Sequence, residues 1–255
     1  MTDAATKVGV LGARGRMGSQ ACKAIDAADG LELVAGVDIH DSLAGLTGAN
    51  AEVVVDFTRP DVVMDNLAWC IKHGVSAVVG TSGFTDERID ELRNLIGDRD
   101  DVTVLIVPNF SIGAVLMMRF AAQAAPYFES VEVVEMHHPD KVDAPSGTAQ
   151  RTAEMISSAR TDAGCSAMPD ATTSDPDGAR GAVVAGVPVH SVRARGLVAH
   201  QEVLLGALGE TLTIRHDSID RESFMPGVVA GVRAVAGADR SLRGVIVGLE
   251  HVLGV

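Results

Sequence analysis

The sequence predicts an α/β fold with a parallel, doubly wound sheet, followed by a smaller α+β region with a mostly antiparallel sheet. Up to about Asn109, short β-branched runs alternate with helical patterns, as parallel strands with crossover helices do. A glycine-rich turn follows the first of these runs. After Asn109 the rhythm changes, and three strand-like runs come in quick succession in the last third of the chain. Their short turns favour antiparallel pairing.

The first part of the chain contains eight predicted elements. Valine-rich runs predict strands at 7–12, 31–38, 51–58, 76–83 and 102–111. Helices are predicted at 16–28, 60–74 and 85–96. In the first helix Met17, Ala21 and Ile25 recur at helical spacing, and the second has Pro60 near its first turn and Gly74 just past its end.

The second part predicts a different arrangement. Helices are expected at 111–127 and 148–160, and strands at 130–138, 187–196, 200–209 and 210–218. Residues 161–181 are rich in Gly, Pro, Asp, Ser and Thr, and so long a loop is usually either functional or disordered. The apolar runs at 223–237 and 243–254 are interpreted as helical and as able to pack on the first domain.

The bulk composition excludes several classes of function. The formal net charge of the 255 residues is -13, which disfavours binding to nucleic acids and anionic membranes. Cys22, Cys70 and Cys165 are widely spaced and odd in number, which favours a reducing compartment over disulfides or a zinc site. No stretch approaches the roughly 18 apolar residues of a transmembrane helix, and no signal peptide is evident. We expect a cytoplasmic protein.

The glycine-rich turn predicts a dinucleotide site. Gly12, Gly15 and Gly18 lie between a predicted strand and a predicted helix, where glycines let the backbone approach a pyrophosphate at the start of the helix. On its own this spacing is equally consistent with a tight turn. Asp38 ends the second strand, where a carboxylate can bind the ribose of NAD. Arg14 or Arg16 could instead hold the 2′-phosphate of NADP, so the preference stays open.

Two further loops end predicted parallel strands. These are "GTSGF" at 80–84 and "VPNFS" at 107–111. Because the carboxyl ends of parallel strands converge on the ligand crevice, we expect their backbones to contact the nicotinamide and its ribose. Ordinary polar loops would be a comparable interpretation if either stood alone.

The stretch "EMHHPDKVDAPSGTA" at 135–149 contains several residue types that can transfer protons or bind anions. His137 and His138 end a predicted strand, so their side chains should point to opposite faces. Adjacent histidines lack the usual spacing of zinc ligands, and no cysteine is close; a metal site is therefore disfavoured. Lys141 is one of only four lysines beside 17 arginines, and an ammonium can supply a proton that a guanidinium cannot readily give.

The helix that follows offers an anion site. The amides of Gly147 and Thr148, with the hydroxyls of Ser146 and Thr148, form a cradle suited to a carboxylate at a helix start. Together with Lys141, this cradle predicts a site for an anionic substrate that is protonated as it is reduced.

These motifs resemble the 4-hydroxy-tetrahydrodipicolinate reductase (dihydrodipicolinate reductase) family of lysine and diaminopimelate biosynthesis. The resemblance rests on "GARGRMG", "VDFTRP", "VVGTSGF", "VPNFSIGAVL" and, most specifically, "EMHHPDKVDAPSGTA", and it continues through "HSVRARGLVAHQEVLLGALGETLTIRHDSIDRESFMPG". Ser82 and Val107 stand where the family commonly has Thr and Ala, and the backbone contacts expected there remain possible.

The resemblance implies a homotetramer in which NADH or NADPH gives hydride to ring C4 of a cyclic dicarboxylate. It implies a dinucleotide-binding domain of residues 1–109 and 222–255, completed by carboxy-terminal helices, and a substrate-binding and tetramerisation domain of residues 110–221. His137 would donate or accept a proton, Lys141 would donate one, and His138, Gly147 and Thr148 would bind a carboxylate. The implied cofactor contacts are Gly12, Ala13, Arg14, Gly15, Arg16, Met17, Asp38, Gly80, Thr81, Ser82, Val107, Pro108, Asn109 and Phe110.

Two alternatives remain from the residues alone. Another Rossmann-type amino-acid oxidoreductase, such as a semialdehyde dehydrogenase, would need an activated cysteine, and none of the three cysteines has such a context. A non-catalytic NAD(P)-binding redox sensor would keep the glycine turn and Asp38 but would have no need of His137 and Lys141.

Overall fold

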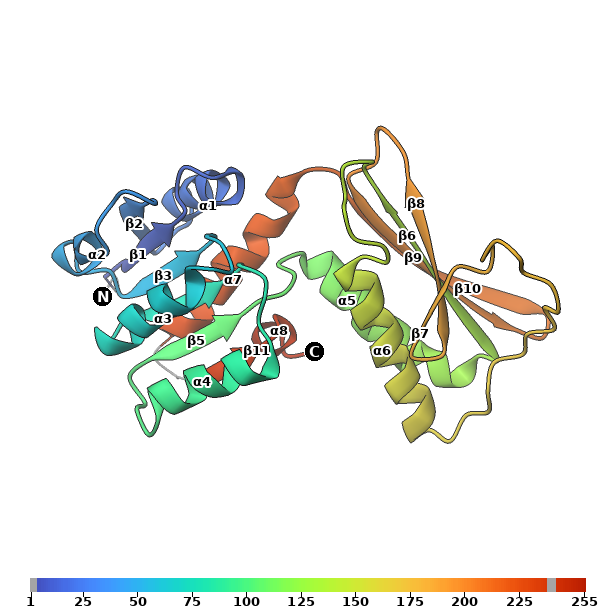
Figure 1. Ribbon diagram of the computed structural model, residues 1–255. Coiled ribbons are helices and arrows are strands. Elements are labelled where there is room, and N and C mark those ends of the chain that lie inside the picture. Colours follow the sequence, from blue (N-terminus) through green and yellow to red (C-terminus); the bar gives the residue numbers. More distant parts are fainter. Residues whose placement is uncertain (1–3, 238–241) are drawn as a thin grey trace. The chain divides into compact units, whose positions relative to one another are not determined.

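The computed structural model describes residues 4–237 and 242–255 of the chain, which divide into two compact units (Figure 1). The first unit contains the chain up to Ile112 and again from Arg221 onward, and the second contains Gly113–Asp220. The second unit is therefore inserted, in sequence, between two parts of the first.

The first unit is built on a six-stranded sheet in which all strands are parallel. Its strands are β1 (Thr6–Leu11), β2 (Leu31–Val37), β3 (Val53–Asp56), β4 (Ser76–Val79), β5 (Thr103–Ile106) and β11 (Gly244–Val247). They lie in the order β11-β5-β4-β3-β1-β2. The strand order reverses between β1 and β3, which is the place where open sheets of this kind bind ligands.

Helices cover both faces of this sheet (Figure 1). They are α1 (Arg16–Asp26), α2 (Ala44–Gly48), α3 (Val63–Lys72), α4 (Asp86–Ile96), α7 (Met225–Ala236) and α8 (Glu250–Leu253), with a 3-10 turn η2 at Arg221–Phe224. Helices α3 and α4 pack on Ala77 and Val79 of β4, whereas Gly231 of α7 lies against Val78. Alternate residues of β4 point to opposite faces of the sheet, and helices cover both faces. All four residues of β4 are therefore buried.

The predicted α/β fold is confirmed, with differences in the last segment. Residues 243–254 were expected to be helical, but residues Gly244–Val247 form β11 and only Glu250–Leu253 are helical. Val245–Val247 pair with β5 in parallel register, and Val245 and Val247 pack on the core under α3 and α4. A short apolar run does not by itself distinguish a buried strand from a helix. The short helix α2, whose Leu46 is buried, was not predicted.

The second unit contains a mixed five-stranded sheet in the order β10-β9-β6-β8-β7. Its strands are β6 (Ser130–His137), β7 (Ala182–Val184), β8 (Val187–Arg193), β9 (Ala199–Ala207) and β10 (Glu210–Ser218). Strands β9 and β10 pair in antiparallel fashion, as expected. The expected pairing of β8 with β9 is wrong, because β6 lies between them and pairs parallel with β8.

Two helices, α5 (Ile112–Ala124) and α6 (Gly147–Asp162), and the 3-10 turn η1 (Ala125–Tyr127) cover one face of this sheet (Figure 1). Val131 and Val133 of β6 share a buried core with Ile156 of α6. Residues on the opposite face include Val192 and Leu204, which are 40% and 38% exposed.

The long segment after α6 is tied to the unit by two arginines. The guanidinium of Arg160 donates to four backbone carbonyls, of Ala125, Phe128, Glu129 and Ser166. Arg180 pairs with Glu132 on β6 and with Asp170. Across both units, no helix in the described ranges is long and apolar enough to cross a membrane.

Candidate active site

The glycine-rich turn has a backbone that larger residues would not allow. Gly12 has a φ of +74°, and a Cβ there would lie 2.5 Å from the carbonyl oxygen of Phe57. A Cβ on Gly18 would overlap the carbonyl group of Gly12. These two glycines therefore let strand β1, the turn and helix α1 pack against one another at backbone distance.

Helix α1 begins at this turn with an open end. Its N-cap is Gly15, no side chain caps it, and its first turn carries no acidic residue. The first amides of a helix have no partner within the helix, and its dipole favours negative charge there. Arg16 and Met17 occupy this first turn. The start of α1 has the geometry of an anion site formed by backbone amides.

Asp38 lies where expected, directly after β2. Its carboxylate accepts hydrogen bonds from the amides of Ile39, at 2.9 Å, and of Arg14, at 2.8 Å. These two hydrogen bonds hold the pKa of Asp38 below its ordinary value. The guanidinium of Arg14 pairs with Asp41 and lies 3.8 Å from Asp38. Arg14 is therefore already engaged by two carboxylates.

These groups line a pocket of about 350 Å³ at the carboxyl ends of β1, β2 and β3. The pocket residues are Leu11, Gly12, Gly15, Val37, Asp38, Ile39, Asp41, Leu43, Phe57, Thr58, Arg59, Val62 and Asn66. The end of β3 lies in the quoted motif "VDFTRP", but no role was predicted for it. Phe57, Thr58 and Arg59 form that part of the wall.

A buried carboxylate organises the end of β3. Asp56 is fully buried and accepts hydrogen bonds from the hydroxyls of Thr58 and Thr81, at 2.6 and 2.7 Å, and from the amide of Asn66 at 3.0 Å. Thr81 was expected to contact the cofactor, but its hydroxyl is used in this network. The loops after β3 and β4 are thereby held together.

The other expected cofactor residues follow β4 and β5. Gly80 packs so closely on the rings of Phe57 and Phe110 that a Cβ would overlap Phe57. Val107 and Phe110 are buried, Gly80 and Ser82 are more exposed, and the amide of Ser111 donates to the side chain of Asn109 at 2.8 Å. Phe57 and Phe110 meet edge to face, with their centroids 5.5 Å apart. The ends of β3, β4 and β5 are therefore joined by aromatic packing.

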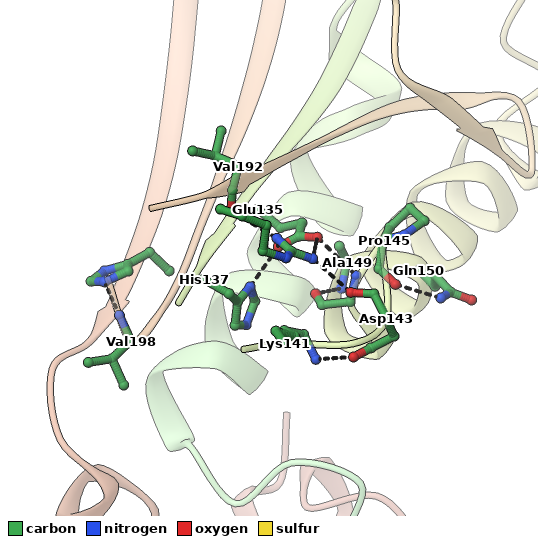
Figure 2. Close-up of polar contacts among 12 residues, drawn as sticks. Glu135, His137, Lys141, Asp143, Pro145, Ala149, Gln150, Val192 and Val198 are labelled. Atoms are coloured by element: carbon green, nitrogen blue, oxygen red, sulfur yellow. Dashed lines mark hydrogen bonds and ion pairs between the residues drawn. The ribbon is translucent and has the colours of Figure 1, made fainter. Parts of the chain in front are cut away.

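In the second unit, His137 ends strand β6 and faces a buried glutamate (Figure 2). Its Nδ1 lies 2.6 Å from Oε2 of Glu135, whose side chain is fully buried. Arg193 of β8 binds both oxygens of the same carboxylate at 2.8 Å. Burial lowers the pKa of His137, and the carboxylate of Glu135 opposes that effect without cancelling it.

Lys141 lies in the loop after β6 and pairs with Asp143 at 2.6 Å (Figure 2). The ion pair lowers the pKa of Asp143, and the Lys141 side chain remains 21% exposed. His138 is half-buried, and its carbonyl accepts from the amide of Lys141 at 3.2 Å. The loop thus carries a cation within a tight turn.

Helix α6 begins directly after this loop. Ser146 is its N-cap; its hydroxyl accepts from the amide of Ala149 at 3.2 Å, and its own amide donates to Glu135 at 3.1 Å. The Ser146 side chain is therefore occupied by capping the helix and is buried. Gly147, by contrast, is exposed, and a Cβ there would meet nothing within 4 Å. Thr148 is half-buried in the same turn.

The structure also identifies residues that sequence analysis missed. Glu135 and Arg193 both lie in quoted motifs, but neither was given a role. A signal was present, because Glu135 shares the strand face of Val131 and Val133, where apolar residues belong. An acid on such a face needs a partner, and Arg193 is that partner.

Comparisons with known proteins agree with these motifs. Family models described as dihydrodipicolinate reductase, N-terminus and C-terminus, match residues 6–110 and 113–253. The chain belongs to the dihydrodipicolinate reductase family. It is 60% identical to a 4-hydroxy-tetrahydrodipicolinate reductase of Streptomyces griseus subsp. griseus, over 97% of both chains. It is 61% identical to the protein of that name from Thermobifida fusca, over 98% of this chain and 99% of the other.

A solved structure supports the same conclusion at the level of the fold. The dipicolinate-bound dihydrodipicolinate reductase of Paenisporosarcina sp. TG-14 matches with a TM-score of 0.83 and 36% identity, over 96% of this chain and 98% of that one. The predicted family is confirmed, and the chain is an enzyme of the dihydrodipicolinate reductase family rather than a non-catalytic sensor. A cysteine mechanism is also disfavoured, because burial raises the pKa of Cys70 to about 12 and also raises that of Cys22.

Proposed function

We propose that the chain reduces 4-hydroxy-tetrahydrodipicolinate to tetrahydrodipicolinate with NADH or NADPH. The cofactor supplies a hydride to ring C4, the 4-hydroxyl group leaves as water, and one proton is taken up. The observation that carries the proposal is the grouping of His137, Lys141 and the start of α6 at one end of β6. These groups supply a base, an acid and an anion site to one substrate.

Proton transfer falls to His137 and Lys141. Hydride addition to a conjugated imine pushes electrons toward the ring nitrogen, and an acid beside that nitrogen prevents charge from building up. Lys141 is a cation with a transferable proton, held by Asp143. His137, whose pKa is lowered by burial, is neutral at pH 7 and suited to accept a proton or a hydrogen bond.

A substrate carboxylate would bind at the start of α6. The backbone of Gly147 is exposed there, and a helix start favours an anion. We assign His138, Gly147 and Thr148 to this role, and we assign Ser146 to shaping the turn through its cap. The dipicolinate named in the Paenisporosarcina structure is a cyclic dicarboxylate, which supports this class of ligand.

The cofactor would bind in the first unit, at the carboxyl ends of its strands. Gly12–Met17 would hold the pyrophosphate, Asp38 the adenosine ribose, and the backbones of Gly80–Ser82 and Val107–Phe110 the nicotinamide end. Support comes from the glycine packing at Gly12 and Gly18, the open start of α1 and the pocket at Asp38.

We also propose that the protein is a cytoplasmic homotetramer assembled through the sheet of the second unit. Val192 and Leu204 are partly exposed on the face opposite to α5 and α6. Pairing this face with other copies would bury them. Light scattering at micromolar concentration would test the tetramer, and a monomer would contradict it.

The activity has a direct test. The condensation product of pyruvate and aspartate semialdehyde, generated enzymatically, is supplied with NADH or NADPH, and cofactor oxidation is followed by absorbance. Wild type should turn over, whereas Lys141→Ala and His137→Ala should lose about 100-fold or more in kcat. Lys72→Ala, at the exposed end of α3, is the matched control. Absence of turnover by folded wild type would contradict the proposed reaction.

A further inference from the structure

Glu135 is fully buried, and its side chain lies beside His137 of the proposed site (Figure 2). Its carboxylate contacts three parts of the second unit. Arg193 of β8 binds both oxygens at 2.8 Å, the amide of Ser146 donates to Oε1 at 3.1 Å, and Nδ1 of His137 lies 2.6 Å from Oε2. An unpaired buried carboxylate would be costly, and these contacts pair it fully.

The carboxylate is ionised in this environment. Burial raises the pKa of Glu135, but hydrogen bonds from Arg193, Ser191 and His137 outweigh it and leave the pKa below its ordinary value. An ionised carboxylate can only accept hydrogen bonds. The nitrogen of His137 that faces it must therefore be the one that carries hydrogen.

This requirement selects one form of the imidazole. A neutral histidine carries hydrogen on one nitrogen and a lone pair on the other. With hydrogen on Nδ1, the lone pair of His137 is on Nε2, on the side of the ring away from Glu135. His137 then offers an acceptor to a substrate, which leaves the donor role to Lys141.

Arg193 extends the same network to the loop between β6 and α6, which contains Lys141. Besides Glu135, its guanidinium donates to the carbonyl of Asp143 at 2.7 Å. Asp143 in turn holds the ammonium of Lys141 at 2.6 Å. The ion pair of the buried Glu135 with Arg193 therefore connects His137, the loop that contains Lys141 and the cap of helix α6.

We propose that Glu135, held by Arg193, is a positioning residue that fixes His137 with hydrogen on Nδ1 and its Nε2 lone pair open to the substrate. The inference about catalysis rests on the proposed role of His137, but the state of the imidazole can be measured without any reaction. This assigns His137 to accepting and Lys141 to donating, a choice that the residue types alone leave open.

The charged groups that face His137 determine its titration. Glu135 on β6 stabilises the imidazolium, whereas Arg193 on β8 and Lys141 in the loop disfavour it, and Asp143 screens the lysine. Replacing Glu135 by an uncharged residue removes the stabilising partner, so the titration midpoint of His137 should fall. The sign is opposite to the rise expected if Arg193 alone were removed.

The chain offers a matched control on the same strand. Glu132 also joins an arginine to a histidine, with Arg180 at 2.7 Å and Nε2 of His190 at 2.6 Å. It lies on the opposite face of β6 from the proposed site, beside Leu204, on the face proposed above to pair with other copies. Glu132→Gln removes the same charge from the same type of triad, and light scattering checks that its oligomeric state is unchanged.

The first measurement is made on wild type, so it does not depend on whether a variant folds. Long-range ¹H–¹⁵N correlation spectra of ¹⁵N-histidine-labelled protein, assigned with His137→Gln, report which ring nitrogen is protonated. At neutral pH we expect hydrogen on Nδ1 of His137. Hydrogen on Nε2 would overturn the proposal, whether or not the protein turns over substrate.

The second measurement compares the variants. Glu135→Gln should shift hydrogen of His137 toward Nε2, because the new amide can donate to Nδ1. Its titration midpoint should fall, and kcat should fall about 100-fold, the scale of one general acid–base group, with KM for the cofactor unchanged. Glu132→Gln should leave the protonated nitrogen and the titration midpoint of His137 unchanged. It should also leave kcat, and KM for the cofactor, within twofold of wild type. A folded Glu135→Gln protein with the wild-type imidazole and kcat would overturn the proposal, while an inactive wild type with hydrogen on Nδ1 would instead contradict the proposed function.

Discussion

Glu132 and Glu135 lie on opposite faces of strand β6, and each carboxylate joins an arginine to a histidine. Their environments differ. The side chain of Glu135 is fully buried, whereas that of Glu132 is 32% exposed. The buried triad of Arg193, Glu135 and His137 adjoins the loop that contains Lys141. The more exposed triad of Arg180, Glu132 and His190 anchors the segment after α6 through Arg180. Strand β6 therefore carries two arginine–glutamate–histidine triads, one around a buried carboxylate and one around a partly exposed carboxylate.

The arginine of the buried triad should contribute to stability as well as to activity. Arg193→Ala leaves Glu135 without its bidentate partner and frees the carbonyl of Asp143. We expect the free energy of unfolding to fall by about 2–3 kcal/mol, below the figure for fully buried pairs because Arg193 is itself partly exposed. Urea denaturation measures this, and Arg151→Ala, which removes an exposed pair with Glu154, should change it by less than about 1 kcal/mol. Equal losses in the two variants would contradict the expectation.

Acid should weaken the fold partly through Glu135. Its pKa is lowered in the folded protein from an ordinary value of 4.5, so below that pH the unfolded chain binds a proton that the folded chain does not. The stabilisation is present above pH 4.5 and is lost as the pH falls through the lower folded value. The stability difference between wild type and Glu135→Gln, measured by denaturation from about pH 7 to about pH 3, should therefore shrink. A difference independent of pH would argue against an ionised Glu135.

The glycine at the start of α1 should be essential for cofactor binding. Gly18→Ala places a methyl group against the carbonyl of Gly12, which forces the turn apart. We expect KM for NADH and NADPH to rise by about tenfold or more, since one lost close contact of this kind costs about 1.4 kcal/mol or more. Gly45→Ala, in helix α2 where a Cβ meets nothing within 4 Å, is the control. An unchanged KM in Gly18→Ala would remove the turn from the proposed cofactor site.

The cofactor preference should respond to Asp41. This carboxylate pairs with the guanidinium of Arg14 beside Asp38, so it both repels a 2′-phosphate and engages a cation that could bind one. Asp41→Asn should raise kcat/KM for NADPH relative to NADH by about twofold to fivefold, the range of exposed ion pairs. Asp90→Asn, which removes an exposed pair with Arg93 on α4, should leave the ratio unchanged. A ratio unaffected by Asp41→Asn would mean that Arg14 does not reach the 2′ position.

Much of the fold follows from local patterns in the sequence. The valine-rich strands and the amphipathic helices of the first unit are local, and each is detected by its own periodicity. Strand β11 was missed because its identity depends on pairing with β5. The paired residues, such as Gly244 and Thr103, lie 141 positions apart in the chain. The insertion of β6 between β8 and β9 is another long-range pairing that turn length does not reveal.

The candidate site was predictable to a similar extent. His137, Lys141 and Gly147 stand in one short motif, so their residue types were enough to suggest their roles. Arg193 lies 58 residues from its partner Glu135, and only the register of β6 and β8 brings the two together. Asp56 was likewise inside a recognised motif, but its network with Thr81 depends on two loops meeting.

The late position of β11 in the chain bears on how the protein is made. Until Gly244–Val247 leave the ribosome, β5 lacks its neighbour on the outer side, and until α7 is complete Val78 and Leu105 lack the packing of Gly231. The inserted unit, by contrast, is complete in sequence by Asp220. The unit whose strands β1–β5 precede the inserted unit is thus the later of the two to acquire all of its parts. Until β11 is made, the outer edge of β5 is unpaired. Unpaired strand edges are where misassembly begins in other proteins.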